Sequence, residues 1–197
     1  LVLMNSYNTK DNPQMKVMIE KYKNIVTIYQ FNQSKIPRID RDTFEPLTRN
    51  NNDENWKYCP PGTGDFVKQF IFSDVYIELL KKNKTHLFLS NIDNLGAIPD
   101  SKILDYVCNN KIDILLEVTD KTLKDVKGGT IIEYDNKLKT LEVAMVPEDF
   151  KNEFYSIDKF KIFNTNNYWL NLNSLPINYN LGLLLNPKVI QNIKIYQ

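Results

Sequence analysis

The sequence predicts an α/β fold in which a mixed, mainly parallel central sheet is flanked by helices. The first thirty residues indicate strand, helix and strand, because the apolar run Leu1–Met4 precedes a helical pattern and a β-branched run follows at Ile25–Tyr29. Later apolar runs at Leu87–Leu89 and Ile112–Val118 have the length of buried strands and alternate with helical patterns. Such alternation is typical of a parallel sheet with helices on its faces.

Two of the predicted helices have clear first residues. Asn12 suits an N-cap and Pro13 suits the first helical position, while Asp100 can cap a second helix. Another helical pattern runs over Phe66–Leu80. The apolar residues at helical spacing after the two caps are Met15, Met18, Ile19 and Tyr22 in the first helix and Ile103, Leu104 and Val107 in the second.

Turn residues divide the remaining chain. Residues 31–65 are expected to be mostly loop, with a polar tract at 50–55. Asp135-Asn136 separates two strand-like runs and predicts a hairpin with a tight turn. Lys159–Phe163 alternates like a strand and is expected to end in Asn164–Asn167.

Composition limits the function classes. The 197 residues are 42% hydrophobic and 25% charged, which is ordinary for a globular protein. A formal net charge of +1 argues against a nucleic-acid polymer or an anionic membrane as partner. Cys59 and Cys108 lack metal-site spacing, so inert thiols in a reducing compartment, with a cytoplasmic location, are expected. The strand-like residues at both ends indicate a piece of a longer protein.

Four polar stretches are candidates for chemistry, and each also has a structural interpretation. Asn91 and Asp93 follow a predicted buried strand, where α/β sheets bind ligands, but the stretch is equally rich in turn formers. Residues 60–65 contain two glycines and form either a binding loop or a turn; the Gly-Lys-Ser/Thr ending of a P-loop is absent. Residues 127–129 provide a cationic contact or the turn into the hairpin, and residues 164–167 provide amides for sugar hydroxyls or a polar turn and helix cap.

Three acidic residues, Asp93, Glu117 and Glu142, lie in or at the ends of strand-like runs. A buried carboxylate needs a partner, so at least one of them is expected to meet a cation or a hydroxyl. The single histidine, His86, stands at the start of a predicted strand and is interpreted as structural.

The order of these stretches is more specific than any one of them. Together they closely resemble the eukaryotic-type UTP–glucose-1-phosphate uridylyltransferases, over nearly the whole chain. The six stretches that carry the resemblance are Leu1-Val2-Leu3-Met4-Asn5-Ser6, Phe31-Asn32-Gln33-Ser34, Pro60-Pro61-Gly62-x-Gly64-Asp65, Ser90-Asn91-Ile92-Asp93-Asn94-Leu95-Gly96, Val126-Lys127-Gly128-Gly129-Thr130 and Phe160-Lys161-Ile162-Phe163-Asn164-Thr165-Asn166-Asn167.

The resemblance implies that residues 1–197 belong to a Rossmann-like nucleotidyltransferase domain that works with Mg2+. A phosphate oxygen of glucose 1-phosphate attacks the α-phosphorus of UTP, pyrophosphate leaves and UDP-glucose forms. By motif, Gln33 and Gly62 hold the uracil, Met4 lines that pocket, and Asn91 contacts the nucleotide or the sugar.

The resemblance also assigns the sugar and the metal. Gly129, Glu142 and Asn166 address the glucose hydroxyls, Lys127 lies close to the sugar, and Asp93 coordinates Mg2+ as well as facing substrate. A single carboxylate suffices, because Mg2+ is commonly held by one or two carboxylates together with phosphate oxygens.

This sequence departs from the family pattern in two ways. Thr63 stands where the family usually has His, so that substrate contact loses an imidazole. The family's upstream glycine-rich loop with its lysine, its downstream lysine and its C-terminal β-helix domain, through which an oligomer could form, have no counterpart in these residues. The chain alone is therefore expected to be inactive, with its catalytic lysines elsewhere.

Other functions remain open. The chain could be a nucleotide-sugar-binding module without turnover, or part of a related UDP-sugar pyrophosphorylase with a different sugar. A glycosyltransferase ranks last, because Asn91-Ile92-Asp93 lacks the Asp-x-Asp pair of that metal site.

Overall fold

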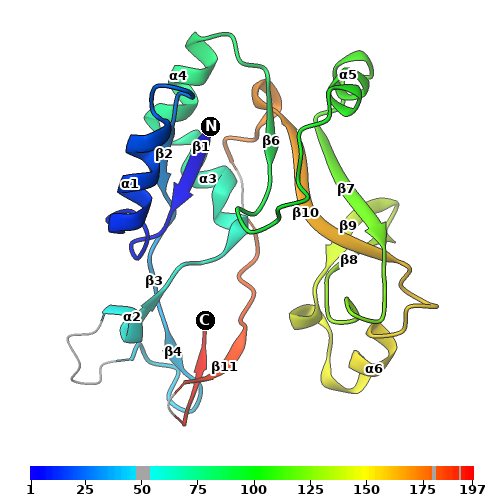
Figure 1. Cartoon of the computed structure of the whole chain (residues 1–197). Coiled ribbons are helices and arrows are strands. Elements are labelled where there is room, and N and C mark those ends of the chain that lie inside the picture. Colours follow the sequence, from blue (N-terminus) through cyan, green and yellow to red (C-terminus); the bar gives the residue numbers. More distant parts are fainter. Residues whose placement is uncertain (48–53, 179–180, 191) are drawn as a thin grey trace. The chain divides into compact units, whose positions relative to one another are not determined.

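The computed structural model describes residues 1–47, 54–178, 181–190 and 192–197, which form two compact units (Figure 1). Unit 1 comprises Leu1–Asn83 and Pro176–Gln197, and unit 2 comprises Lys84–Leu175. Each unit is described by itself. Most of the polar tract at 50–55 lies outside the described residues.

Unit 1 begins with the predicted strand, helix and strand. Strand β1 (Val2–Asn5) pairs in parallel with β2 (Tyr29–Asn32), and α1 (Pro13–Tyr22) connects them. The Asn12 side chain accepts hydrogen bonds from the backbone N–H groups of Gln14 and Met15, which confirms the predicted N-cap.

The second strand begins later than predicted. The run that starts at Ile25 was expected to be extended, but the N–H groups of Ile25 and Val26 bond to the carbonyl of Tyr22. Ile25 and Val26 therefore belong to the turn that follows α1, and β2 starts only at Tyr29.

The remaining elements of unit 1 are short. The helical pattern at 66–80 divides into two helices, because Ser73 accepts a hydrogen bond from the N–H of Tyr76 and so begins a new helix. The expected loop at 31–65 contains short strands. In chain order the elements are β3 (Ile36–Pro37), β4 (Ile39–Asp40), α2 (Glu54–Lys57), β5 (Tyr58–Cys59), the 3-10 helix η1 (Thr63–Asp65), α3 (Phe66–Ile71), α4 (Asp74–Lys81), β11 (Pro187–Ile190) and β12 (Ile193–Tyr196).

Three phenylalanine rings form the centre of unit 1. The centroid of Phe31 lies 5.7 Å from that of Phe66 and 5.6 Å from that of Phe70, and the latter two rings stack at 5.0 Å. All three side chains are buried. This packing places the end of β2 against the start of α3, where two of the predicted site stretches lie.

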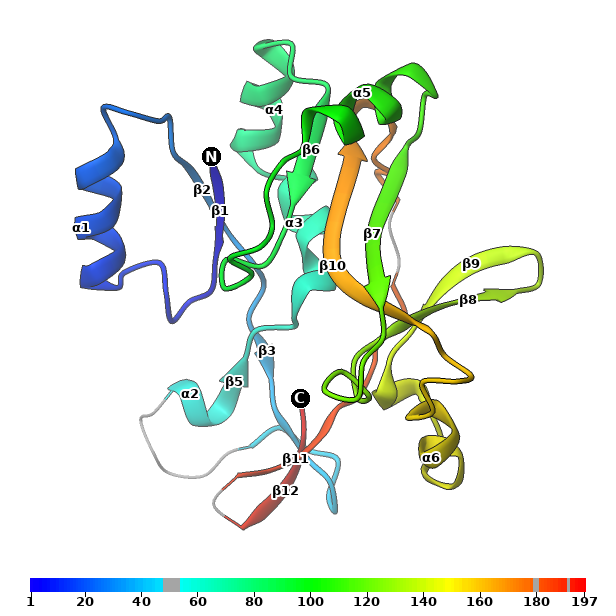
Figure 2. The same cartoon turned by 45° about the vertical axis from the view of Figure 1, so that its right-hand side comes forward.

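Unit 2 contains a three-stranded sheet in the order β6-β10-β7 (Figure 2). Strands β6 (His86–Leu89) and β7 (Ile114–Asp120) both pair antiparallel with β10 (Ile162–Asn171), so they run in the same direction on either side of it. Helix α5 (Ser101–Asn109) begins after Asp100, whose side chain accepts from the N–H of Lys102, as predicted.

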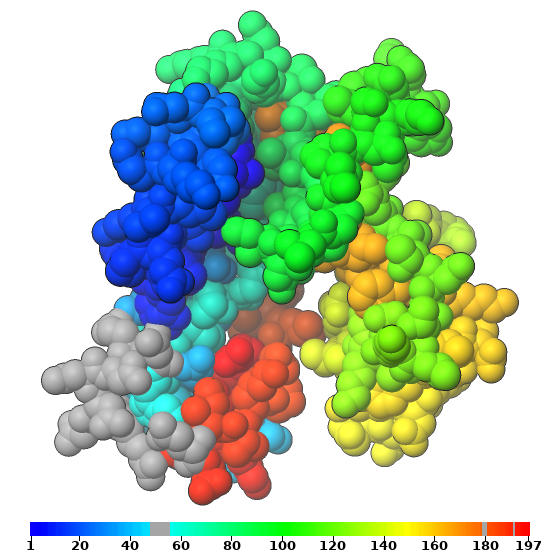
Figure 3. Space-filling model, in the orientation of Figure 1, coloured from blue at the N-terminus to red at the C-terminus, as the bar shows by residue number. Residues whose placement is uncertain are grey.

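A hairpin and several short helical turns complete unit 2. Strands β8 (Thr130–Tyr134) and β9 (Lys137–Leu141) pair as predicted, with a φ of 55° at both Asp135 and Asn136 in the turn. The helical turns are η2 (Val143–Met145), η3 (Glu148–Phe150), α6 (Lys151–Phe154) and η4 (Leu172–Ser174); α6 and its neighbours appear in yellow in Figure 3.

The observed class is mixed α/β, and a mainly parallel sheet is not confirmed. Among the described residues only β1 and β2 pair in parallel, and the sheets are small. The strand expected to end at Asn164 instead continues to Asn171. A bulge between Asn164 and Asn167 lets β10 resume pairing with β7, so these residues are neither a strand end nor a helix cap.

None of the described helices is long and apolar enough to cross a membrane. Both cysteines are free, with Cys59 buried and Cys108 exposed.

Candidate functional site

One group of predicted site residues lies in unit 1, where β2 ends. Gln33 follows β2, and its backbone N–H donates to the carbonyl of Asn5 over 2.8 Å, so the β1–β2 ladder holds its backbone. Its side-chain Oε1 is buried and has no hydrogen-bond partner in the described part of the chain. An unpaired buried acceptor is costly, so this oxygen is suited to accept a hydrogen bond from a ligand.

The carboxylate of Asp65 connects this strand end to η1. Its Oδ2 accepts from the backbone N–H of Ser34 over 2.6 Å, and its Oδ1 accepts from the Ser34 hydroxyl over 3.1 Å. The Gln69 amide donates to the same hydroxyl over 2.7 Å and to Oδ1 over 3.3 Å. We call Met4, Gln33, Ser34, Gly62, Thr63, Asp65 and Gln69 the Gln33 cluster.

Gly62 gives this cluster an open backbone edge. Its φ of 95° lies in the region that favours glycine, and an added Cβ would meet nothing within 4 Å. Gly62 and Thr63 are both exposed, and Met4 is half-buried in β1 opposite Phe31. The surface beside Gly62 is therefore accessible to a ligand's polar atoms.

The second group lies in unit 2, around the bulge of β10. Asn166 has a φ of 61°, and its side-chain amide donates to Oδ1 of Asn91 over 2.8 Å. The Asn94 amide donates to Oδ1 of Asn167 over 3.2 Å. Two side-chain hydrogen bonds therefore hold the loop that follows β6 against the bulge, and they bring together Asn91 and Asn166, which are far apart in sequence.

Glu117 of β7 supports the bulge from the other side. Its carboxylate accepts from the indole N–H of Trp169 over 2.7 Å and from the amide of Asn167 over 3.1 Å. Aromatic and amide N–H groups therefore satisfy Glu117, and of the three acids it is Glu142 that interacts with a cation, Lys121. Asp93, by contrast, is exposed, and no partner of its carboxylate is found among the described residues.

Gly129 and Glu142 form the other half of this group. Gly129 is buried, and a Cβ built on it would lie 2.2 Å from Oε1 of Glu142, so the carboxylate occupies the space that a side chain would need. Burial raises the pKa of Glu142, while a hydrogen bond with the Asn164 side chain and the charge of Lys121 lower it.

Tyr168 of β10 belongs to the same environment. Burial raises the pKa of its hydroxyl, the hydrogen bond with the Asn164 side chain lowers it, and the Glu142 charge raises it further. Lys127 is exposed, and no hydrogen bond or ion pair of its side chain occurs in the described ranges. We call Asn91, Lys121, Gly129, Glu142, Asn164, Asn166 and Tyr168 the Asn166 cluster.

Several members of these clusters carry no role that was predicted from the sequence. Asp65 ends the stretch at residues 60–65, and an acid just before a helical run is a recognisable signal for a helix start. Its partner Ser34, however, lies 31 residues away in the sequence. Lys121 gave no signal, since lysine is normally exposed. Asn164 was only part of an amide run, and its hydrogen bond with Glu142 depends on tertiary structure.

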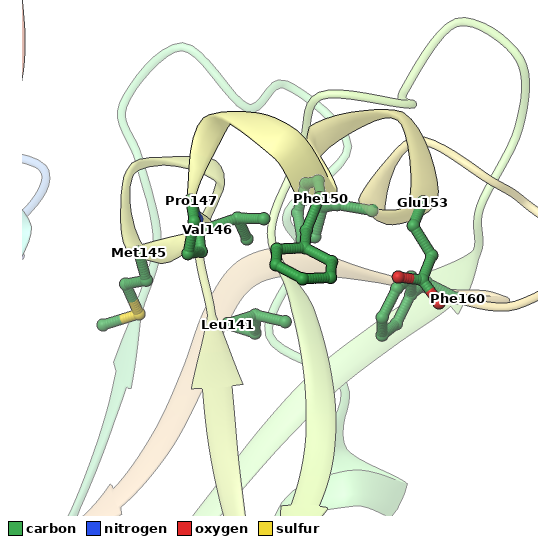
Figure 4. Close-up of a pocket in the computed structure, with 8 residues that line it drawn as sticks. Leu141, Met145, Val146, Pro147, Phe150, Glu153 and Phe160 are labelled. Atoms are coloured by element: carbon green, nitrogen blue, oxygen red, sulfur yellow. The ribbon is translucent and has the colours of Figure 1, made fainter.

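An apolar hollow of about 220 Å³ lies beside the end of β9 (Figure 4). Glu153 is the only charged residue of its lining, so the hollow lacks the converging polar groups that a sugar or a nucleotide needs. The lining residues are Leu141, Met145, Val146, Pro147, Phe150, Glu153, Phe154 and Phe160.

Comparison with known sequences gives one consistent result. The model of the family described as UTP–glucose-1-phosphate uridylyltransferase matches residues 1–197. The protein of that name from Solanum tuberosum is 44% identical over 203 residues, which cover 100% of this chain and 42% of the relative. A second such protein from Dictyostelium discoideum is also 44% identical, with 100% and 40% covered.

Solved structures agree with the sequence comparison. The crystal structure of UDP-glucose phosphorylase from Trypanosoma brucei superposes with a TM-score of 0.90 at 32% identity, covering 100% of this chain and 47% of that one. A mutant UDP-glucose pyrophosphorylase from Leishmania major, crystallised with UDP-glucose, gives 0.82 at 29% identity, covering 100% and 46%. The chain thus spans less than half the length of the relatives it matches.

Proposed function

We propose, because this chain belongs to the family of UTP–glucose-1-phosphate uridylyltransferases, that a protein carrying it transfers a uridylyl group from UTP to glucose 1-phosphate. The products are UDP-glucose and pyrophosphate. Residues 1–197 would form part of a Rossmann-like nucleotidyltransferase domain, for which the parallel β1–β2 pair and the common direction of β6 and β7 give partial support.

The buried, unpartnered Oε1 of Gln33 is the observation that carries this proposal. Uracil has an N–H donor between two carbonyl acceptors, whereas cytosine has an acceptor at the corresponding ring nitrogen. A buried amide oxygen without a partner therefore suits uracil, with the oxygen accepting from the ring N–H, and the open backbone of Gly62 is the second group assigned to the base. Met4 would line the same pocket, and the Thr63 hydroxyl would stand in for the imidazole usual in the family.

The Asn166 cluster provides groups that suit a sugar. Hydroxyl groups both donate and accept, and the cluster combines the amides of Asn91 and Asn166 with the carboxylate of Glu142 beside the Gly129 backbone. We assign the glucose hydroxyls to Gly129, Glu142 and Asn166, and Asn91 to the nucleotide or the sugar. Lys127, being exposed on the same loop as Gly129, would lie on the sugar side.

Asp93 fits a magnesium ion as a single ligand. Its carboxylate is exposed and unpartnered among the described residues, which contain no group of three or more side chains that could hold a metal by themselves. Phosphate oxygens and water would complete the coordination, as is common for Mg2+. When bound, the ion would neutralise charge on the phosphates.

The reaction requires positioning and not a covalent intermediate. A phosphate oxygen of glucose 1-phosphate forms a bond to the α-phosphorus of UTP, and the bond from that phosphorus to the pyrophosphate oxygen breaks. The chain's part is to hold uridine, sugar and metal, since alignment and charge neutralisation account for most of the catalysis of phosphoryl transfer. The family resemblance also implies lysines on the phosphates, so turnover is expected of a protein that supplies them together with these residues.

Two other functions have specific support. Thr63 in place of His favours a module that binds nucleotide sugars without turnover. The amides of Asn91 and Asn166 do not by themselves distinguish glucose from another hexose, so a related UDP-sugar pyrophosphorylase is the other candidate. A cytoplasmic location, which is expected from the two free thiols, is part of the proposal. An oligomer formed through a C-terminal domain is a further part, which rests on the family resemblance.

Pyrophosphate release from UTP, glucose 1-phosphate and Mg2+ by the full-length protein tests the proposal. Asp93→Ala should abolish release and keep the folded state, whereas Asp105→Ala, which removes an exposed acid from α5, should release pyrophosphate at the wild-type rate. If the folded wild-type protein binds UDP-glucose and releases no pyrophosphate, the enzyme proposal fails and the nucleotide-sugar-binding module is the function that remains. Release with galactose 1-phosphate in preference to glucose 1-phosphate would identify the related enzyme.

A further inference from the structure

Lys121 is the only buried charged residue in the described part of the chain, with 6% of its surface exposed. It follows directly after β7, and its backbone N–H donates to the carbonyl of Lys161 over 2.7 Å. A lysine is rarely buried to this extent unless its ammonium group has partners. The position therefore calls for an explanation.

The ammonium group of Lys121 contacts two backbone carbonyls and one aromatic ring. Its Nζ donates to the carbonyl oxygen of Gly128 over 3.2 Å and to that of Phe154 over 3.5 Å, and it lies 4.4 Å from the centroid of the Phe154 ring. Phe154 is 1% exposed and belongs to α6, so one end of this arrangement is fixed in a packed region. The other end is the glycine pair that precedes β8.

Side chains pack directly against the backbone of the glycine pair. A Cβ on Gly128 would lie 2.2 Å from Cε2 of Phe163, and a Cβ on Gly129 would lie 2.2 Å from Oε1 of Glu142. The Gly129 carbonyl in turn accepts from the backbone N–H of Asn164 over 2.9 Å. A shift of the Gly128 carbonyl would therefore displace both the Gly129 backbone and the carboxylate that rests on it.

Lys121 also acts on Glu142 through its charge. Burial raises the pKa of Glu142, and the positive charge of Lys121 opposes this effect by lowering it. Burial lowers the pKa of Lys121, and the charges of Asp125 and Glu142 raise it. Tyr168 of β10 is the other titratable group that interacts with Glu142, and the Asn164 amide is its neutral partner. Lys121 is thus the cationic neighbour that favours an ionised Glu142.

We propose that Lys121 is a positioning residue for sugar recognition: it holds the Gly128-Gly129 backbone in place and keeps the Glu142 carboxylate charged and oriented toward the sugar hydroxyls. This inference rests on the proposed function, because it assumes that Gly129 and Glu142 meet the sugar. The inference concerns neither the metal site nor the uracil site. Removal of the Lys121 side chain should therefore weaken recognition of glucose 1-phosphate and leave recognition of UTP unchanged.

The test compares Lys121→Met with Lys124→Met in the full-length protein. Methionine keeps much of the length of the side chain and removes its charge, and Lys124 is an exposed lysine of the same loop. Lys121→Met should raise KM for glucose 1-phosphate about tenfold and leave KM for UTP within about twofold, since hydrogen bonds to a charged group are lost on the sugar side only. Lys124→Met should match the wild type for both substrates.

The pH profile distinguishes positioning from general structural damage. With Lys121 removed, the pKa of Glu142 rises, so the acidic limb of kcat/KM for glucose 1-phosphate should move to higher pH. Damage to the fold alone would lower the active fraction and Tm without moving this limb. If Lys121→Met does not fold, the same measurements are made on Lys121→Gln. The glutamine amide carries no charge but can still donate to the carbonyls of Gly128 and Phe154.

The outcomes separate the two proposals. If either folded variant keeps the wild-type KM for glucose 1-phosphate and the wild-type acidic limb, the role of Lys121 is refuted while the proposed function stands. If the wild-type and Lys124→Met proteins both fold and release no pyrophosphate, the proposed function itself fails. Equal rises of KM for both substrates would also contradict a role confined to the sugar.

Discussion

Asp65 shows how one carboxylate fixes the residue beside it. Its two oxygens accept from the N–H and the hydroxyl of Ser34, and Ser34 directly follows Gln33. Both oxygens of Asp65 are thus engaged within the protein. The contribution expected of Asp65 is to hold the backbone from which the Gln33 side chain leaves the strand end.

Replacement of Asp65 by Asn tests this contribution. One oxygen becomes an N–H donor, so one of the two Ser34 donors loses its acceptor, which should cost about 1–3 kcal/mol of unfolding free energy. KM for UTP should rise more than KM for glucose 1-phosphate in steady-state kinetics of the full-length protein. Asp42→Asn, at an exposed acid of the same unit, is the matched control and should change neither. An unchanged KM for UTP would show that Asp65 serves stability alone.

Gly129 is a second position where one added atom, a Cβ, would change the site. An alanine there would place its Cβ 2.2 Å from Glu142, so the carboxylate has to move. Gly129→Ala should therefore weaken UDP-glucose binding by about tenfold or more, as measured by calorimetry, and leave the affinity for UMP unchanged. Gly182→Ala is the control, because an added Cβ at that glycine meets nothing within 4 Å. Wild-type affinity of Gly129→Ala for UDP-glucose would remove Gly129 and Glu142 from the sugar site.

At the scale of elements, local signals and the β8–β9 hairpin were predicted well, whereas the pairing of the long strand β10 was not. The caps at Asn12 and Asp100 define the starts of α1 and α5, because a cap depends on two or three neighbouring residues. The hairpin turn at Asp135-Asn136 was found for the same reason. The course of β10 was not, because its continuation past Asn164 depends on β7, whose residues lie about 50 positions earlier.

The candidate site divides in the same way. The stretches that contain Asn91 and Asn166 could each be a site or a turn, and the match of several stretches to one family in order favoured a site. The structure then showed the hydrogen bond between the two side chains. No role was predicted for Asp65 or Lys121, because their partners are hydroxyl, carbonyl and ring groups that a local sequence pattern does not reveal. The parallel sheet was overestimated because alternating strands and helices do not specify which strands become neighbours.

The bulge of β10 lets fold and function be separated experimentally. Asn166 has a φ of 61°, which glycine adopts without strain, so Asn166→Gly should keep the bulge and change the unfolding free energy by less than about 1 kcal/mol. It removes the amide that faces Asn91, and UDP-glucose affinity should fall about threefold to tenfold by calorimetry. Asn136→Gly, at another asparagine with positive φ, should keep full affinity. Equal affinities of the two variants would mean that the Asn166 amide does not meet the ligand.

At the scale of the whole molecule, the two candidate clusters belong to different compact units. All members of the Gln33 cluster lie in unit 1, and all members of the Asn166 cluster lie in unit 2. Under the proposed function, recognition of the uridine and recognition of the sugar should therefore be separable in energy.

A double-mutant cycle on UDP-glucose binding measures this separation. Asp65→Asn weakens the Gln33 cluster and Gly129→Ala weakens the Asn166 cluster, and substitutions without shared partners usually add within about 0.5 kcal/mol. The loss of binding free energy in the double variant should thus equal the sum of the two single losses, measured by calorimetry on full-length protein. An interaction energy above about 1 kcal/mol would mean that the clusters act as one cooperative site, and the division of uridine and sugar between the units would have to be abandoned.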